Sequence, residues 1–252
     1  MTNKIAIITG GSRGLGKSAA LKLAQQGVAV ILTYHSKEAE AHAVVAQIEA
    51  LGGSAAALQL DVGQSQSFDA FADKVKQTLT RKWQRTSVDF LVNNAGVGAH
   101  ALIAETSEAQ FDLLMNVHFK GVFFLTQKLL PLIADHGRII NISSGLARFA
   151  LPGYGAYAAM KGAIEVLSRY LAKELGPRRI TVNVVAPGAI ETDFGNGAVR
   201  DNAELNQFVA AQTALGRAGV PDDIGGVIAS LLNDDNGWIN AQRIEASGGM
   251  FL

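Results

Sequence analysis

Apolar runs and helical patterns alternate along the whole chain. Short β-branched runs are apolar at nearly every position, and longer stretches between them repeat apolar residues every three or four positions. Strands that are apolar throughout are buried on both faces, which is typical of a parallel sheet covered by helices on either side. The pattern predicts strands at Ile5–Thr9, Val28–Thr33, Ala56–Asp61, Val88–Val92, Arg138–Ile142, Ile180–Val185 and Arg243–Ala246.

Right-handed crossovers between such strands give a doubly wound, Rossmann-type α/β fold, whose ligands bind beyond the carboxyl ends of the strands. No linker or repeat interrupts the pattern, so we expect one dinucleotide-binding and catalytic domain over residues 1–252. The predicted helices are Gly14–Gly27, Glu38–Leu51, a helix that ends near Thr80, Ser107–Ala134 and Tyr154–Leu175.

Two segments depart from the alternation. Thr80–Ser87 is basic and polar, and we expect a solvated loop there. Phe194–Phe208 follows the end of a predicted strand and lacks clear early periodicity. A mobile substrate loop would lie at that place, so residues 190–215 are the expected substrate loop.

Charge and composition narrow the function classes. The 22 basic residues balance 22 acidic ones, which gives no field to attract nucleic acid or an anionic membrane. The chain has no cysteine, and its histidines are scattered, so neither a disulfide framework nor a metal site is expected. No targeting segment or membrane span is recognisable, and the expected location is the cytoplasm.

The loop after the first strand fits two incompatible descriptions. Gly11–Ser18 reads G-S-R-G-L-G-K-S, a literal match to the phosphate loop of nucleotide hydrolases. Such an enzyme also needs a magnesium-holding aspartate, a role that Asp61 could take. Thr9–Gly16 reads T-G-G-S-R-G-L-G, the spaced glycines of a dinucleotide site. A plain glycine-rich turn is the third possibility, and the loop alone does not decide.

In the dinucleotide interpretation each glycine has its own task. Gly10 permits a tight turn, Gly14 lets the backbone approach the pyrophosphate, and Gly16 lets the helix pack closely on the strand. The helix N-terminus then offers free N–H groups to the phosphates.

The stretch S-S-G-L-A-R-F-A-L-P-G-Y-G-A-Y-A-A-M-K favours the dinucleotide interpretation. Tyr157 and Lys161 are four residues apart and share a helix face, and Ser144 lies at the end of the preceding strand. A free tyrosine has a pKa of about 10, so proton transfer near neutrality needs a shift of roughly 2–3 units. A neighbouring ammonium stabilises the phenolate and can supply that shift. These three residues suit proton transfer to a carbonyl.

Taken together, the motifs resemble the short-chain dehydrogenase/reductase family over essentially the full chain. The match to the phosphate loop of nucleotide hydrolases is then a coincidence, because Lys17 and Ser18 happen to follow the third glycine. The matching features are T-G-G-S-R-G-L-G at Thr9–Gly16, Asp61 with Val62, N-N-A-G at Asn93–Gly96, Asn116, Ser144, Y-A-A-M-K at Tyr157–Lys161 and P-G-A-I-E-T at Pro187–Thr192.

The resemblance implies a role for each matching residue. Tyr157 would be the general acid in reduction and the base in oxidation, and Ser144 would hold the substrate oxygen. Lys161 would lower the pKa of Tyr157 and bind the nicotinamide ribose. Asn116 would orient a water that links Lys161 to solvent. The remaining residues implied to contact the cofactor are Gly10, Ser12, Arg13, Gly14, Leu15, Gly16, Asp61, Val62, Asn93, Ala95, Gly96, Pro187, Gly188, Ile190 and Thr192.

The end of the second strand favours NADP(H) over NAD(H). NAD-dependent enzymes usually have an acidic residue there that binds the ribose hydroxyls. Here the first carboxylate is Glu38, already inside the predicted helix. Arg13 can instead receive a 2′-phosphate. The residues expected beside it are Thr33, Tyr34, His35, Ser36 and Lys37.

An apolar and aromatic set of side chains predicts a hydrophobic ketone as substrate, reduced by a general carbonyl reductase. The alternative is a 3-oxoacyl-acyl-carrier-protein reductase; Arg178 and Arg179 could face the carrier, but Asp135 lies where a basic residue would be expected. A non-catalytic NADP(H) sensor or scaffold is a third possibility. The resemblance also implies a homotetramer. The side chains expected at the substrate are Leu146, Phe149, Leu151, Tyr154, Phe194 and Phe208.

Overall fold

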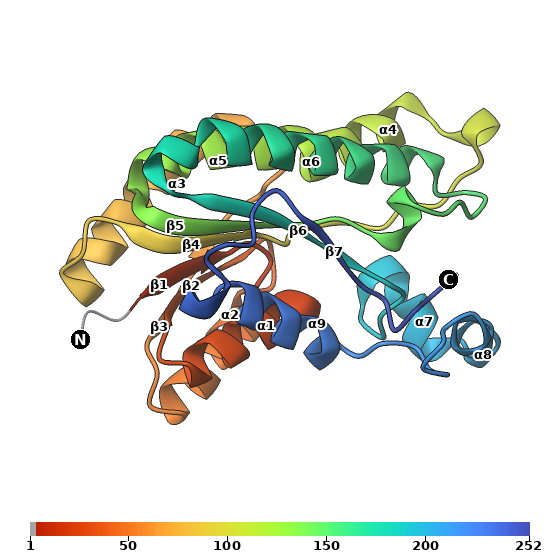
Figure 1. The fold of residues 1–252 in the computed structure, drawn as a ribbon, viewed down its shortest axis with the longest axis horizontal. Helices are drawn as coiled ribbons and strands as arrows, with labels where there is room; N and C mark the ends of the chain where they lie inside the picture. Colours follow the sequence, from red (N-terminus) through yellow and green to blue (C-terminus); the bar gives the residue numbers. More distant parts are fainter. Residues whose placement is uncertain (1–3) are drawn as a thin grey trace.

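One parallel sheet of seven strands organises the protein (Figure 1). The computed structural model describes residues 4–252. The strands lie in the order β3-β2-β1-β4-β5-β6-β7, and every neighbouring pair is parallel. The predicted doubly wound α/β fold is therefore confirmed. The strands are β1 (Ile5–Ile8), β2 (Ala29–Tyr34), β3 (Ala55–Gln59), β4 (Val88–Asn93), β5 (Ile133–Ile142), β6 (Thr181–Pro187) and β7 (Arg243–Ala246).

Helices cover both faces of the sheet, with α3, α5 and α6 on one side and α1, α2 and α9 on the other (Figure 1). The short helices α7 and α8 lie at the end of the molecule that holds the C-terminus. None of the helices described is long and apolar enough to cross a bilayer. The helices are α1 (Gly14–Gln25), α2 (Glu38–Ala50), α3 (Phe68–Thr78), α4 (Glu108–Met115), α5 (Gly121–Leu129), α6 (Gly155–Glu174), α7 (Ala198–Asp201), α8 (Ala203–Ala211) and α9 (Pro221–Leu231).

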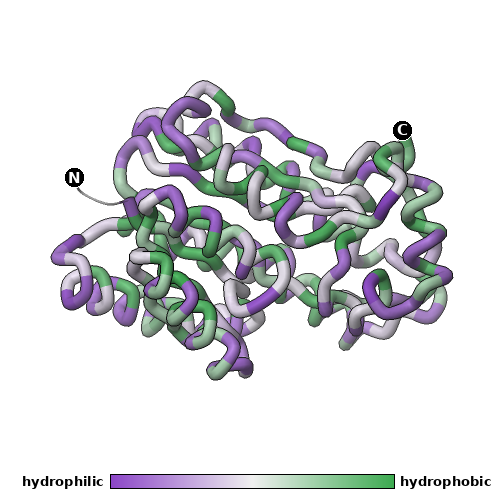
Figure 2. The backbone as a smooth tube through the Cα atoms, turned by 90° about the horizontal axis from the view of Figure 1, so that it is seen from below, coloured by the Kyte–Doolittle hydropathy of each residue, from purple (hydrophilic) through white to green (hydrophobic). Residues whose placement is uncertain are grey.

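Strand β1 illustrates why the strands are apolar at every position. Ala6 and Ile8 belong to the core under α1, α2 and α9, whereas Ile5 and Ile7 belong to the core under α3, α5 and α6. Successive side chains of a strand point to opposite faces, and here both faces are covered. Figure 2 shows the complementary pattern, with many hydrophilic positions along the outer helices and turns.

The helix predicted over Ser107–Ala134 is confirmed from Glu108 to Leu129, but its end is wrong and it contains a π-helical turn. Helix α4 ends at Met115 and is followed by the π-helical turn η4 (Asn116–Lys120) and by α5. A 3₁₀ turn that contains Pro131 then ends the helical segment, and Ile133 already pairs with Val88 in the sheet. The proline cannot donate a backbone hydrogen bond, so it separates helix from strand within an apolar run whose periodicity gives no boundary.

Both expected loops contain helical structure. Leu79–Trp83, at the start of the basic connection, forms a π-helical turn, and the Trp83 indole N–H donates to the Ser54 hydroxyl at 2.9 Å. The substrate segment forms a 3₁₀ turn at Phe194–Gly197 and then α7 and α8. Gly195, Asn196 and Gly197 have positive φ angles of 61°, 60° and 75°, which explains the missing early periodicity.

Candidate active site

A cavity of about 450 Å³ runs along the carboxyl ends of the strands. It begins beside Arg13 and the end of β2, passes the ends of β1 and β4, and reaches α6 and the segment after β6. This is the place that the doubly wound topology reserves for ligands. The predicted site residues that line it are Gly10, Ser12, Arg13, Gly14, Leu15, Tyr34, His35, Ser36, Asp61, Val62, Ala95, Gly96, Ser144, Tyr157, Lys161, Pro187, Gly188, Ile190 and Thr192.

The N-terminus of α1 opens into this cavity at Gly14. The N-cap residue Arg13 makes no side-chain capping hydrogen bond, and the first turn carries no acidic residue. The first N–H groups of a helix have no partner within the helix, and they attract anions. Gly10 and Gly14 adopt positive φ angles of 65° and 55°, so the loop needs glycine at both positions. These features fit a dinucleotide pyrophosphate.

Lys17 and Ser18, the two residues that complete the match to the phosphate loop of nucleotide hydrolases, do not reach the cavity. Lys17 does not line the cavity. Ser18 is buried within α1, and its hydroxyl donates to Asp222 of α9 at 2.5 Å. A phosphate loop would need both side chains at the phosphates and the magnesium ion. The geometry therefore favours the dinucleotide interpretation.

Gly16 does not line the cavity, but it allows the glycine loop to pack closely on α1 and Asn94. A Cβ atom on Gly16 would lie 2.3 Å from the Gly10 carbonyl oxygen and 2.6 Å from Nδ2 of Asn94. Asn94 donates Nδ2 to the carbonyls of Thr9 and Gly10, at 2.8 and 3.1 Å. The side chain of Asn94 thus links the end of β4 to the glycine loop, a role that the sequence analysis missed although the N-N-A-G motif contains this residue.

Asn93 does not contact the cavity, contrary to the prediction. It is buried, and its Nδ2 donates to Thr126 at 3.0 Å and to Asn141 at 2.8 Å. Side chains alternate along β4, so Asn93 points under α5 whereas the chain beyond it turns into the cavity. Its role in this structure is to join β4, β5 and α5.

The adenosine end of the cavity carries two basic side chains near the end of β2, and its acidic residues lie elsewhere, with Asp61 beyond β3 beside His35. Arg13 and Lys37 both line it. Glu38 lies in the first turn of α2, outside the cavity lining, where it hydrogen-bonds Tyr34. An Arg13 guanidinium nitrogen lies 3.6 Å from an Asp193 carboxylate oxygen on the opposite wall. No carboxylate therefore takes the position that would bind the ribose hydroxyls at the end of β2.

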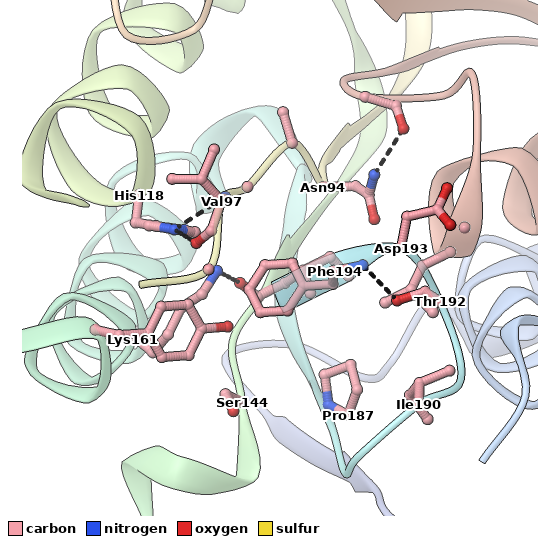
Figure 3. A pocket seen from close by; sticks show the side chains of 18 of the residues that line it. Asn94, Val97, His118, Ser144, Lys161, Pro187, Ile190, Thr192, Asp193 and Phe194 are labelled. Atoms are coloured by element: carbon pink, nitrogen blue, oxygen red, sulfur yellow. Dashed lines mark hydrogen bonds between the residues drawn. The ribbon is translucent and has the colours of Figure 1, made fainter. Parts of the chain in front are cut away.

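Tyr157 and Lys161 lie one turn apart on α6, and Ser144 lies just beyond β5 in the same cavity (Figure 3). Lys161 Nζ donates to the Ile142 carbonyl at 2.8 Å and lies 5.5 Å from the centroid of the Tyr157 ring. Tyr157 and Lys161 are buried. The structure thus brings together the three residues that the sequence singled out.

Ser143 and Ser144 have different hydrogen-bond partners, and this difference distinguishes their roles. The Ser143 hydroxyl donates to the Glu165 carboxylate at 2.7 Å, so Ser143 is committed to α6. Ser144 lines the cavity, where its hydroxyl accepts from the nearby Leu146 N–H at 3.2 Å and also hydrogen-bonds Tyr157. Arg243 of β7 donates to the Ser144 carbonyl at 3.3 Å and to Glu165 at 2.7 Å. These contacts support the choice of Ser144 as the substrate-binding serine.

Burial dominates the electrostatics of the site. Burial raises the pKa of Tyr157 above its ordinary value, although a hydrogen bond with Ser144 lowers it in part. Burial also lowers the pKa of Lys161 to about 7. The predicted lowering of the Tyr157 pKa by Lys161 is thus opposed by the removal of both groups from water.

Asn116 does not line the cavity, whereas His118 does. Asn116 begins the π-helical turn η4, and its carbonyl accepts the N–H of Gly121. His118, two residues later, is buried with its ring edge-on to Tyr157, at a centroid distance of 5.1 Å. The predicted role of Asn116, orienting a water that links Lys161 to solvent, stays a prediction. The sequence offered only one signal for His118, a histidine within an otherwise apolar helical stretch.

The far end of the cavity is apolar. The six side chains predicted at the substrate all line it, and Phe194 lies 5.9 Å from Tyr157 between ring centroids. Further apolar contributors were not named from the sequence. Those of α7 and α8 lie within the expected substrate loop, residues 190–215, whereas no local pattern connects the one in the C-terminal turn to the site. These contributors are Val199, Leu205, Val209 and Met250.

Comparisons with known proteins identify the family of the chain. A family model described as enoyl-(acyl carrier protein) reductase matches residues 10–251. The chain belongs to the short-chain dehydrogenase/reductase family. An uncharacterized oxidoreductase of Methylorubrum extorquens is 40% identical over 250 residues, which cover 99% of this chain and 98% of the relative. The 3-oxoacyl-[acyl-carrier-protein] reductase FabG of Staphylococcus epidermidis is 37% identical over 252 residues, or 99% and 100% of the two chains.

Solved short-chain dehydrogenase/reductase structures superpose closely on this one. The promiscuous reductase LugOII, which catalyses keto-reduction at C1 in lugdunomycin biosynthesis, gives a TM-score of 0.94 at 39% identity and covers 100% of this chain and 99% of its own. The angucycline C-6 ketoreductase LanV with bound NADP gives 0.94 at 36% identity, with 98% and 95% covered. This member of the family is an enzyme, an oxidoreductase.

Proposed function

We propose that this short-chain dehydrogenase/reductase reduces a hydrophobic ketone to a secondary alcohol with NADPH. The observation that carries the proposal is one continuous cavity. It joins the uncapped N-terminus of α1, the Ser144–Tyr157–Lys161 group and an apolar end. LanV, which superposes on this chain, is a ketoreductase with bound NADP.

The chain's own residues would hold the cofactor in a definite orientation. The N–H groups at the start of α1 would bind the pyrophosphate, and Arg13 with Lys37 would bind the 2′-phosphate. Ile190 and Thr192 would border the carboxamide, and Lys161 the nicotinamide ribose. When bound, NADPH supplies the hydride that reduces the carbonyl carbon.

Proton transfer is the task of the chain's own residues. The Ser144 hydroxyl would donate a hydrogen bond to the ketone oxygen, and Tyr157 would transfer its phenolic proton to that oxygen as the C–H bond forms. The Lys161 ammonium would stabilise the resulting phenolate. Because Tyr157 and Lys161 are buried, water competes little for these hydrogen bonds.

The substrate proposed is a flat, largely apolar ketone. Phe149, Phe194 and Phe208 line the cavity, together with aliphatic side chains of α7, α8 and the C-terminal turn. Aromatic walls favour aromatic ligands through offset and edge-on contacts. We assign residues 190–215 to substrate binding because Phe194, Leu205 and Phe208 all belong to this segment.

Reduction of carrier-bound 3-oxoacyl groups is the second candidate, favoured by the FabG relative. Of the two arginines proposed to face the carrier, Arg178 is already engaged, whereas Arg179 is exposed. Arg178 donates to Asp135 at 2.8 Å and to the Leu130 carbonyl at 3.0 Å. With Asp135 and two backbone carbonyls on its guanidinium, Arg178 has fewer donors left for an acidic partner. The engagement of Arg178 by Asp135 therefore favours a free ketone over a carrier-bound 3-oxoacyl group as the substrate.

A homotetramer in the cytoplasm remains our proposal for assembly and location. Exposed apolar side chains on α4, α5 and α6 support an assembly through that layer of helices. Exposed apolar faces of this kind commonly become interfaces. The side chains are Phe111, Leu113, Phe123, Phe124, Val166 and Tyr170. Sedimentation velocity on the purified protein tests the tetramer.

A thermal-shift titration with NADPH, NADH and Mg-ATP tests the cofactor, and a panel of free ketones and 3-oxoacyl thioesters tests the substrate. Stabilisation by NADPH at micromolar concentration, followed by turnover of aromatic ketones, is the expected result. Preferred turnover of carrier-bound thioesters would establish the second candidate. NADPH binding without turnover of any carbonyl would indicate the non-catalytic sensor.

A further inference from the structure

His118 is held at the centre of the site by three contacts. Its Nε2 lies 2.7 Å from the Val97 carbonyl oxygen (Figure 3). Its ring lies edge-on to Tyr157. Its Cε1 would lie 2.8 Å from a Cβ atom on Gly96. The imidazole therefore fits between the chain beyond β4 and helix α6, and it borders the cavity on the side of Tyr157.

Two contacts with Val97 bear on the tautomer of the ring. The Val97 N–H lies 3.3 Å from Nε2, where Nε2 would have to accept. We assign the hydrogen to Nε2 because the contact with the Val97 carbonyl oxygen is the shorter one, at 2.7 Å, and a carbonyl oxygen only accepts. Burial, and then the charge of Lys161, lower the pKa of His118 to about 3. The ring is thus neutral near pH 7, and Nδ1 is a bare acceptor.

Nδ1 is buried and has no hydrogen-bond partner among residues 4–252. Leaving a buried acceptor unsatisfied costs about 1–3 kcal/mol, so a purely structural residue here would be better apolar.

Lys161 provides the complementary group. An ammonium has three hydrogens, and the Ile142 carbonyl is its one hydrogen-bond acceptor among residues 4–252. Even with one hydrogen given to the nicotinamide ribose, another remains. Lys161 and His118 both border the Tyr157 ring, at 5.5 Å and 5.1 Å from its centroid.

We propose that His118 is a positioning residue of the proton-transfer site, with Nε2–H anchored on Val97 and Nδ1 accepting a hydrogen bond from the side of Lys161. The inference rests on the proposed ketone reduction. The accepted hydrogen bond favours the charged ammonium, and the ammonium in turn favours the Tyr157 phenolate. His118 takes up no proton itself, so the overall reaction is unchanged.

Few other ionisable groups surround this arrangement. Tyr154 faces Tyr157 from the start of α6. Glu165, one turn beyond Lys161, is held by Ser143 and Arg243. A pH effect of a change at His118 therefore reports on Tyr157 and Lys161.

The test compares His118→Phe, His118→Asn and the matched control His100→Phe. Phenylalanine keeps an aromatic edge against Tyr157 but removes both nitrogens. Asparagine keeps an amide that can donate and accept. His100 makes the same kind of edge-on contact with Tyr154, at 5.0 Å, but is exposed and does not line the cavity.

For His118→Phe we expect kcat to fall about tenfold or more, the typical cost of one lost buried hydrogen bond. The apparent pKa of alcohol oxidation should rise by about one unit because the phenolate is less stabilised. His118→Asn should recover most of kcat, and His100→Phe should match the wild type. NADPH stabilisation in the thermal-shift assay should persist in all three variants.

An unchanged kcat and pH profile in His118→Phe would overturn the proposal. So would a loss of NADPH stabilisation in that variant alone, since His118 would then serve the cofactor site. If His118→Phe does not fold, His118→Asn decides, and a kcat for His118→Asn about tenfold or more below the wild type would refute the inference. Absence of NADPH binding or ketone turnover in the wild type would instead refute the proposed function.

Discussion

Lys161 follows Tyr157 by one helical turn on α6, and its Nζ lies 5.5 Å from the centroid of the Tyr157 ring. Both side chains are buried, and the ammonium donates to the Ile142 carbonyl at the end of β5. Helix α6 thus sets the spacing of the pair, and the sheet fixes the ammonium against the cavity wall.

Replacing Tyr157 by phenylalanine should remove the acid without disturbing the fold. We expect kcat for ketone reduction to fall by about 10²–10⁴-fold, the usual contribution of general acid catalysis. NADPH binding should change little, because the ring remains. Steady-state kinetics with NADPH titration measure both quantities, and turnover close to the wild-type rate would show that another group is the acid.

Lys161 makes stability depend on pH with a definite sign. Burial lowers its pKa to about 7 in the folded protein, against an ordinary value of 10.5. Between these values the unfolded chain binds more protons than the folded protein, so the free energy of unfolding rises with pH. Below pH 7 both states carry the charge, and the full cost of burying it remains.

The variant Lys161→Met isolates this effect, because it removes the ammonium but keeps an apolar stem. We expect it to exceed the wild type in melting temperature at pH 7, with the difference shrinking towards pH 9.5. Circular dichroism melts at several pH values measure this. A difference that stays constant with pH would mean that the ammonium is not desolvated in the folded protein.

Arg13 should determine the choice of cofactor. Replacing it by glutamine removes the charge beside the end of β2, and a lost charge-assisted hydrogen bond costs about 1.5–3 kcal/mol. The dissociation constant for NADPH should rise about tenfold or more, while that for NADH stays the same. Fluorescence titration measures both, with Lys17→Gln as control because Lys17 does not line the cavity. An equal loss for the two cofactors would contradict a 2′-phosphate site.

Phe194 should contribute to substrate affinity rather than to chemistry. Its ring lies 5.9 Å from the Tyr157 ring, and the side chain is 45% exposed. Replacing it by alanine should raise KM for a polycyclic aromatic ketone several-fold, since about 1–2 kcal/mol of apolar contact is lost. The kcat for a small ketone should hardly change. A fall in kcat with constant KM would instead place Phe194 in the positioning of Tyr157.

Much of the fold could be predicted because both faces of the sheet are covered. Continuous apolar runs such as Ile5–Ile8 are what a fully buried strand requires, and the helices between them have clear periodicity. The boundary at Ile133 was missed for the same reason. An apolar run that is buried in either state gives no periodicity at the point where helix turns into strand.

The sequence by itself determined the groups that do the chemistry. Glycines that need positive φ and a Tyr–Lys pair at helical spacing carry their constraints locally, so Gly10, Gly14, Tyr157 and Lys161 could be found without a structure. Only the tertiary structure decided which neighbours complete the site. Asn93 turns under α5, Asn94 links β4 to the glycine loop, and His118 rather than Asn116 faces Tyr157. These choices depend on the direction of each side chain where separate elements meet, and no local pattern encodes that direction.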